Sequence, residues 1–87
     1  MSINIEIYTW QFCPFCIRAK ALLDKKGVEY IEYLIDGDEA AREKMAERAN
    51  GRTSVPQIFI ENRHIGGCDD IYDLESQGKL NSLLGIN

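Results

Sequence analysis

Residues 9–23 read TWQFCPFCIRAKALL and place Cys13 and Cys16 three positions apart, with Pro14 directly after the first cysteine. The residues that follow have the apolar spacing of an amphipathic helix. A Cys-X-X-Cys pair in this position is compatible with half of a metal site, a structural disulfide or a catalytic pair of thiols. Other features of the sequence are needed to distinguish these three kinds of site.

The pattern around this stretch alternates between strands and helices. Its order, βαβ followed by ββα, predicts parallel pairing of the first two strands across a helical crossover. In chain order, we predict a strand at residues 3–7 with one buried face, a helix over 16–27, a strand over 28–35, a helix over 36–51 capped by Asp38, a hairpin over 57–67, and a helical stretch from about Asp69 that is broken at Gly78.

The predicted helices are amphipathic. The side chains expected to face the core are Ile17, Ala21, Leu22, Leu23, Ala41, Met45, Ala49, Ile71, Leu74, Leu80, Leu83 and Leu84. The charged residues of the second helix are expected to form its exposed face; they are Glu39, Arg42, Glu43, Lys44, Glu47 and Arg48.

The start of the first helix favours reactive chemistry at Cys13. Unpaired N–H groups and the positive end of the helix dipole stabilise a thiolate there, and the thiolate is the nucleophilic form. Pro14 suits the first helical position because its fixed φ fits the helix and no N–H is needed there. Cys16 lies one turn inward, within reach of a disulfide but less exposed. Cys13 is therefore expected to attack and Cys16 to resolve.

Composition excludes several classes of protein. The 87-residue chain is short enough to form one domain over residues 1–87, and the net charge of −4 argues against a nucleic-acid-binding face. The start MSINIEIY has no basic region before an apolar run, so we expect neither a signal peptide nor a membrane span. Three cysteines are too few for a secreted disulfide scaffold, which favours a reducing, cytoplasmic location.

The metal and structural-disulfide interpretations are weaker. A structural zinc site needs four ligands, and beyond the Cys-X-X-Cys pair the chain offers Cys68 and His64. We expect His64 to be a surface or half-buried strand residue, and we expect no metal site. A static disulfide across the first turn of a helix is rare in cytosolic proteins. A redox-active dithiol is the stronger interpretation, because a Cys-X-X-Cys pair that opens a helix after a strand is typical of redox motifs.

Three segments together make this interpretation specific. CPFC at residues 13–16, TSVPQIF at 53–59 and GGCDD at 66–70 occur in the order found in glutaredoxins, and over essentially its full length the chain resembles the dithiol type of that family. Phe15 stands where the commoner active site has tyrosine. The resemblance implies a thioredoxin-like α/β fold, with a small mixed four-stranded sheet flanked by helices.

The resemblance also implies a glutathione site. Pro56 would be a cis-proline beside Cys13, so that the backbone of Val55 can pair with a substrate. The N-terminus of the last helix would receive the γ-glutamyl carboxylate of glutathione, with Asp69 or Asp70 as the N-cap. Cys68 is expected to be a small buried residue beside this site. The implied catalytic residues are Cys13, Cys16 and Pro14, and the implied glutathione-binding residues are Cys13, Phe15, Ser54, Val55, Pro56, Gly67, Cys68 and Asp69.

One position departs from the family. Glutaredoxins often carry a lysine three residues before the nucleophile, where its charge favours the thiolate and meets the glycyl carboxylate of glutathione. This chain has Trp10 there. Arg18 and Arg52 are candidates to supply the missing charge, and a solvated surface position is the expectation for Arg18.

The expected function is that of a glutathione-dependent thiol-disulfide oxidoreductase with glutathione as co-substrate. Its partners would be glutathione and glutathionylated or disulfide-containing proteins, with no nucleic acid and no membrane, and the chain would act as a monomer. Two alternatives stay open. One is a thioredoxin-type reductant, against which Pro14 and the GGCDD segment argue. The other is a glutaredoxin that binds an iron–sulfur cluster through Cys13, which Pro14 disfavours.

Overall fold

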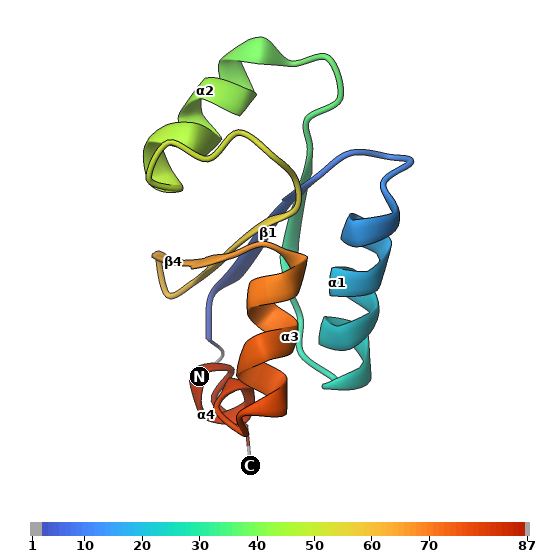
Figure 1. Ribbon diagram of the computed structural model, residues 1–87, viewed down its shortest axis with the longest axis vertical. Helices are drawn as coiled ribbons and strands as arrows, with labels where there is room; N and C mark the ends of the chain where they lie inside the picture. The colour runs from blue at the N-terminus through green and yellow to red at the C-terminus, as the bar shows by residue number, and fades with distance from the viewer. Residues whose placement is uncertain (1–2, 87) are drawn as a thin grey trace.

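The computed structural model describes residues 3–86 and contains a four-stranded sheet in the order β2-β1-β3-β4 (Figure 1). β1 (Ile5–Thr9) pairs in parallel with β2 (Ile31–Leu34) and antiparallel with β3 (Gln57–Ile60), which pairs antiparallel with β4 (Arg63–Gly66). The helices are α1 (Pro14–Lys25), α2 (Glu39–Arg48), α3 (Cys68–Ser76) and α4 (Leu80–Leu83). The predicted mixed sheet and its βαβ plus ββα order are confirmed.

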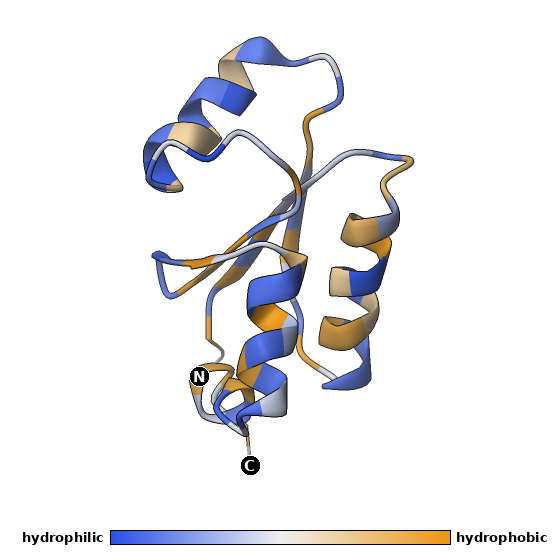
Figure 2. Ribbon diagram, in the orientation of Figure 1, coloured by the Kyte–Doolittle hydropathy of each residue, from blue (hydrophilic) through white to orange (hydrophobic). Residues whose placement is uncertain are grey.

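The two faces of the sheet are covered differently. α1 and α3 lie side by side against one face, and α2 lies against the other (Figure 1). Residues that alternate along β1 and β3 supply both faces: Ile7 and Ile58 pack under α1 and α3, while Tyr8 and Phe59 pack under α2. In Figure 2, apolar segments occur along both α1 and α3, whereas α2 is mostly hydrophilic.

The central strand departs from the sequence expectation. One buried face was predicted for it, but all five residues of β1 are buried. The reason is that β1 lies between β2 and β3, with helices above and below, so neither of its faces meets solvent. Even Glu6 and Thr9 are buried here, and each is hydrogen-bonded to other side chains.

The buried stripe of α1 also differs from the predicted one. Leu22 and Leu23 are buried as expected, whereas Ile17 is 56% exposed and Ala21 is exposed. The inward face begins instead at Cys16 and continues through Ala19. Cys16, Ala19 and Leu23 follow one another at three- and four-residue spacing, so the first two turns of α1 bury Cys16 and Ala19 in place of the predicted Ile17 and Ala21.

The helix ends follow local signals. Asp38 caps α2, its Oδ1 accepting a hydrogen bond from the N–H of Ala41 at 3.0 Å, as predicted. α1 begins with Pro14 at its first position and ends before Gly27, which has a φ of 72°. Within residues 3–86, no helix has the length and apolar character needed to cross a membrane.

Candidate active site

Cys13 occupies the N-cap position of α1. Its backbone is extended, with φ −130° and ψ 108°, and Pro14 follows at the start of the helix. The Cys13 Sγ accepts a hydrogen bond from the backbone N–H of Cys16 at 3.3 Å. The sulfur therefore replaces the side-chain oxygen that usually caps a helix, and it receives one of the N–H groups that lack a partner within the helix.

The two sulfurs of the motif have unequal surroundings. Cys13 is 8% exposed and Cys16 is fully buried, and both are free thiols. Cys13 is thus the more accessible of the pair, as predicted, but its helix start is largely covered rather than exposed. Burial, together with the neighbouring Cys13, raises the pKa of Cys16 to about 12. Cys16 is therefore a thiol at neutral pH unless its surroundings change.

The Val55–Pro56 segment lies directly opposite Cys13. The peptide bond between these residues is cis, which confirms the expectation from the family resemblance. The Cys13 Sγ lies 4.0 Å from the Val55 carbonyl oxygen. Ser54 is exposed, and its carbonyl and hydroxyl oxygens both accept from the buried Gln57 side chain, which ties this loop to β3.

The glycine turn before α3 meets the same segment. A Cβ at position 67 would lie 3.2 Å from the Pro56 carbonyl oxygen, so glycine permits the close approach of the two backbones. Gly67, rather than Asp69 or Asp70, is the N-cap of α3, and the helix begins at Cys68. The predicted aspartate N-cap is wrong because the helix already begins at Cys68, so that Asp69 and Asp70 both lie within its first turn.

Asp70 instead stabilises the helix start from its third position. Its Oδ2 accepts the N–H of Gly67 at 2.8 Å and pairs with Arg52 Nη1 at 3.0 Å. The hydrogen bond from Gly67 and then the bond from Arg52 hold the pKa of Asp70 below its usual range. Gly66 makes room for this carboxylate: it has a φ of 125°, and a Cβ there would collide with the Asp70 side chain.

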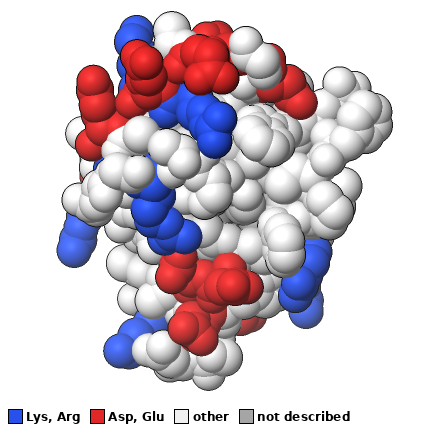
Figure 3. Space-filling model, turned by 45° about the horizontal axis from the view of Figure 1, so that its top comes forward, with Lys and Arg blue, Asp and Glu red and all other residues white. Residues whose placement is uncertain are grey.

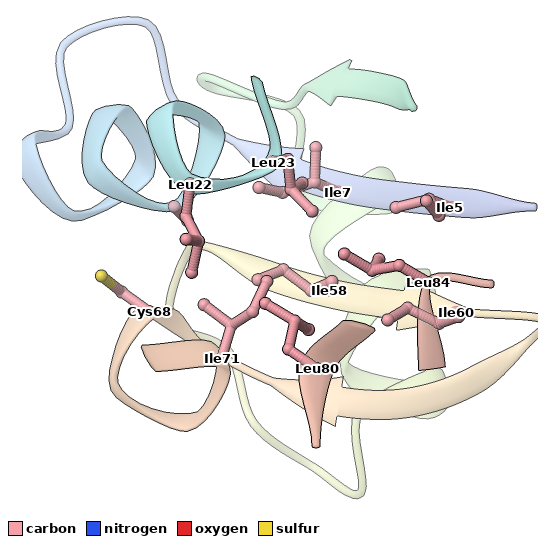
Figure 4. Close-up of a cluster of buried hydrophobic side chains, with 11 residues drawn as sticks. Ile5, Ile7, Leu22, Leu23, Ile58, Ile60, Cys68, Ile71, Leu80 and Leu84 are labelled. Atoms are coloured by element: carbon pink, nitrogen blue, oxygen red, sulfur yellow. The ribbon is translucent and has the colours of Figure 1, made fainter. Parts of the chain in front are cut away.

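Cys68 lies at the edge of the apolar cluster that includes Leu22 and Ile71 (Figure 4). It is 5% exposed, and this burial raises the pKa of its thiol. The expectation of a small buried residue is confirmed. Arg18, two residues after Cys16, is exposed, as expected, and its guanidinium lies over the Tyr72 ring at 5.3 Å.

Arg42 is a residue that the sequence analysis did not single out for the site. Its guanidinium lies 5.9 Å from the centre of the Trp10 ring, and its Nε donates to the Thr53 carbonyl oxygen at 3.2 Å. A cation therefore stands beside the position where the family often has lysine. Nothing local in the sequence distinguishes Arg42 from the other charged residues of α2.

The surface around Cys13 carries exposed aromatic rings. Phe12 is 88% exposed and Phe15 is 53% exposed, and Trp10 is partly exposed beside them. In Figure 3, charged side chains of both signs gather over α2, whereas the surface at the upper right of that view is uncharged. An apolar rim around a covered thiol is suited to contact with another molecule.

His64 is a half-buried strand residue, as predicted. Its Nε2 lies 2.7 Å from Gln57 Oε1 and its Nδ1 lies 3.2 Å from Asn50 Nδ2. Burial, followed by the positive charge of Arg52, lowers the pKa of His64. The imidazole is therefore neutral at neutral pH, and its two ring nitrogens link Gln57 of β3 and Asn50 to β4 through hydrogen bonds.

Comparison with known proteins agrees with this arrangement. The glutaredoxin family model matches residues 5–65. A probable glutaredoxin of Synechocystis sp. is 67% identical over 97% of this chain and 96% of that protein, and Glutaredoxin 3 of Escherichia coli is 59% identical over 93% and 96%. The crystal structure of a buckwheat glutaredoxin–glutathione complex superposes with a TM-score of 0.86 at 30% identity, covering 93% of this chain and 76% of that one.

The sheet order, the helix that begins at a Cys-Pro-Phe-Cys motif and the cis-proline opposite its first sulfur thus accompany a family match over most of the chain. The fold is thioredoxin-like, and thiol–disulfide exchange is the chemistry that these features support. On these grounds the chain belongs to the glutaredoxin family.

Proposed function

We propose that this protein is a glutathione-dependent oxidoreductase that reduces glutathione mixed disulfides and protein disulfides through Cys13 and Cys16. The observation that carries the proposal is the placement of the Cys13 sulfur, at the start of α1 and 4.0 Å from the Val55 carbonyl. A sulfur there can be reached by a second sulfur from solvent, while the neighbouring backbone pairs with the chain that carries it.

The reaction proceeds by successive thiol–disulfide exchanges. The Cys13 thiolate attacks the glutathione sulfur of a mixed disulfide, the S–S bond breaks, and the substrate thiolate leaves and takes up a proton. A free glutathione thiolate then attacks the glutathione attached to Cys13, which releases glutathione disulfide and restores Cys13. With a protein disulfide, the Cys13 thiolate attacks one sulfur, the S–S bond of the substrate breaks, and a mixed disulfide with Cys13 forms. Cys16 then attacks the Cys13 sulfur, this bond breaks, and the second substrate thiolate leaves and takes up a proton. Two glutathione molecules reduce the resulting Cys13–Cys16 disulfide and are released as glutathione disulfide.

Two ends of the site suit the charges of glutathione. The first N–H groups of α3, at Cys68 and Asp69, lie next to Arg52 and suit the γ-glutamyl carboxylate. At the other end, Arg42 beside Trp10 suits the glycyl carboxylate. The buckwheat relative is described as a complex with glutathione, which supports the same ligand here.

The test is reduction of a small glutathione mixed disulfide, with glutathione, glutathione reductase and NADPH as the recycling system. We expect turnover with the wild type and none with Cys13→Ser. Cys16→Ser should retain turnover, because free glutathione replaces the resolving thiol. The same variant should lose reduction of a substrate whose disulfide lies within one protein.

A second arm of this experiment separates glutathione from other electron donors. Replacing the glutathione system with thioredoxin reductase and NADPH should give little turnover. Efficient turnover with thioredoxin reductase and none with glutathione would contradict the proposal. So would a Cys13→Ser variant that stays active while Cys16→Ser is inactive.

A further inference from the structure

The proposed function requires Cys16 to act as a thiolate, although its surroundings oppose that state. Cys16 is fully buried, and burial is the largest cause of its raised pKa. A hydrogen bond from the backbone N–H of Trp10 works in the opposite direction. A smaller favourable influence is the positive charge of Lys20, which lies four residues further along α1 and therefore one turn away on the same side of the helix.

Lys20 is held by side chains from the two strands beneath α1. Its Nζ lies 2.9 Å from Glu32 Oε2, and the same oxygen accepts a hydrogen bond from the Thr9 hydroxyl at 2.6 Å. Thr9 is fully buried, and the side chains of Lys20 and Glu32 are each 27% exposed. One carboxylate oxygen thus joins α1 to β1 and β2.

The strand register explains why these groups meet beneath the helix. Glu32 is the partner of Ile7, and Thr9 lies two residues beyond Ile7, so all three side chains share one face of the sheet. Ile7 packs in the same cluster as Leu22 and Leu23 of α1, which identifies this face as the one that α1 covers. Thr9 also immediately precedes Trp10, whose N–H contacts Cys16.

We propose that Lys20, positioned by Glu32 and Thr9, supplies the positive charge that stabilises the Cys16 thiolate during the resolving step. Glu32 and Thr9 are positioning residues, because they keep the ammonium group against α1 instead of in solvent. The titratable and charged groups around Cys16 are Cys13 at the helix start, Lys20 on the next turn and, through Lys20, Glu32 from β2.

The step that Lys20 assists is an exchange with no external oxidant. Cys16 loses its proton to solvent, and its thiolate attacks the Cys13 sulfur of a Cys13–S–S–R mixed disulfide. The bond between Cys13 and R breaks, the Cys13–Cys16 disulfide forms, and R leaves as a thiolate that takes up a proton. The first attack by Cys13 needs no Cys16 thiolate, so Lys20 affects the second step selectively.

The two steps can be separated with dithiodipyridine, an aromatic disulfide that needs no glutathione site. Attack by Cys13 releases one coloured thiopyridone, and attack by Cys16 then releases the second. Stopped-flow absorbance follows both phases, and mass spectrometry of acid-quenched samples confirms that the second phase forms the Cys13–Cys16 disulfide. The rates are compared for wild type, Lys20→Gln, Lys20→Arg and the matched control Lys25→Gln, which removes an exposed charge from the same helix.

We expect the second phase of Lys20→Gln to be about three- to fourfold slower at neutral pH. Loss of one nearby charge lowers the thiolate population roughly tenfold, and the greater nucleophilicity of a more basic thiolate recovers a factor of about three. The rise of this rate with pH should move to higher pH. Lys20→Arg should restore it, and Lys25→Gln should match the wild type in both phases.

An unchanged second phase in a folded Lys20→Gln protein would overturn the proposal, and so would an equal slowing in Lys25→Gln. Failure of Lys20→Arg to restore the rate would assign the effect to packing rather than charge. Thr9→Val is a milder second variant, because it keeps the shape and removes the hydroxyl that holds Glu32; it should slow the same phase. These outcomes are independent of glutathione, so they do not depend on whether glutathione proves to be the electron donor.

Discussion

The two faces of the sheet hold their helices by different means. Under α1 and α3, the contact is made by aliphatic side chains from strands and helices, with Cys68 at its edge (Figure 4). Under α2, a smaller cluster of Tyr8, Met45 and Phe59 is completed by a charged pair. Arg48 donates to Glu6 Oε2 at 2.8 Å, and its guanidinium lies 4.1 Å from the centre of the Phe59 ring.

This difference matters for the candidate active site, because each face of the sheet holds a helix that carries different site residues. The face under α1, which carries both thiols, holds that helix mainly through apolar contacts that do not depend on pH, and the partly exposed Lys20–Glu32 ion pair adds to them. The charged face fixes α2, which carries Arg42 beside Trp10. We therefore expect substitutions in the apolar cluster under α1 to lower the free energy of unfolding strongly and by the same amount at every pH. Substitutions in the charged pair under α2 should lower it less, and by an amount that depends on pH.

The largest effect is expected for Leu23→Ala. Leu23 is fully buried between α1 and the sheet, and removing its side chain leaves a cavity. We expect the free energy of unfolding to fall by about 2–5 kcal/mol. Denaturant titrations at several pH values should give the same loss. A loss that varies strongly with pH would mean that Leu23 is not held by apolar contacts alone.

Glu6→Gln should have the next largest effect, about 1–3 kcal/mol at neutral pH, because Arg48 loses its charged partner. Hydrogen bonding from Arg48 is the main cause that lowers the pKa of Glu6 in the folded state. The carboxylate therefore stabilises the fold above the ordinary pKa of glutamate, and this contribution disappears as the pH falls through the lowered value.

The measurement is the difference in unfolding free energy between wild type and Glu6→Gln as a function of pH. It should be constant near neutrality and shrink in acid. Glu43→Gln, an exposed charge change on α2, serves as the control and should show little difference at any pH. A Glu6→Gln difference that grows in acid would exclude the charged pair as the cause.

Arg42→Gln addresses the part of the site that α2 supplies. If Arg42 meets the glycyl carboxylate, its loss should raise KM for a glutathione mixed disulfide about two- to fivefold with little change in kcat, as expected for one partly exposed charge. Lys44→Gln is the matched control, because it removes an exposed charge from the same helix. A change in kcat alone would contradict a binding role.

Trp10→Lys tests the same glycyl carboxylate of glutathione by adding a positive charge instead of removing one. It places a positive charge where the family often has lysine, so it should favour the Cys13 thiolate. In the double variant with Arg42→Gln, it should lower the raised KM part of the way back to the wild-type value. Thiolate absorbance and the KM of the double variant measure the two effects. No change in either quantity would show that position 10 does not face the reacting groups.

Ile17→Ser should have the smallest effect. The sequence pattern places Ile17 in the core, but it is 56% exposed on α1. We expect the free energy of unfolding to change by less than about 0.5 kcal/mol, in contrast to Leu23→Ala on the buried side of the same helix. A loss comparable to that of Leu23→Ala would mean that the inward face of α1 is misassigned.

Much of the fold could be predicted because its signals are local. The Asp38 cap, Pro14 at the start of α1 and the alternation of strands and helices each depend on neighbouring residues. The positions of the Cys-Pro-Phe-Cys motif and of the turn before α3 were also recognisable from short segments. The exact start of α3 was not, because Gly67 and Asp70 divide between them the capping role that the sequence assigns to one aspartate.

The sequence by itself therefore determined the order of the elements, the thiol pair at a helix start and the family. Tertiary structure decided which side of α1 is buried, why Arg48 points inward, and that Arg42 stands beside Trp10. It also joined Lys20, one turn after Cys16 on α1, to Glu32 and Thr9 of the sheet. Helix starts and strand alternation arise from contacts within a few residues, whereas each of these features depends on strand register and on segments distant in the chain, which no local pattern encodes.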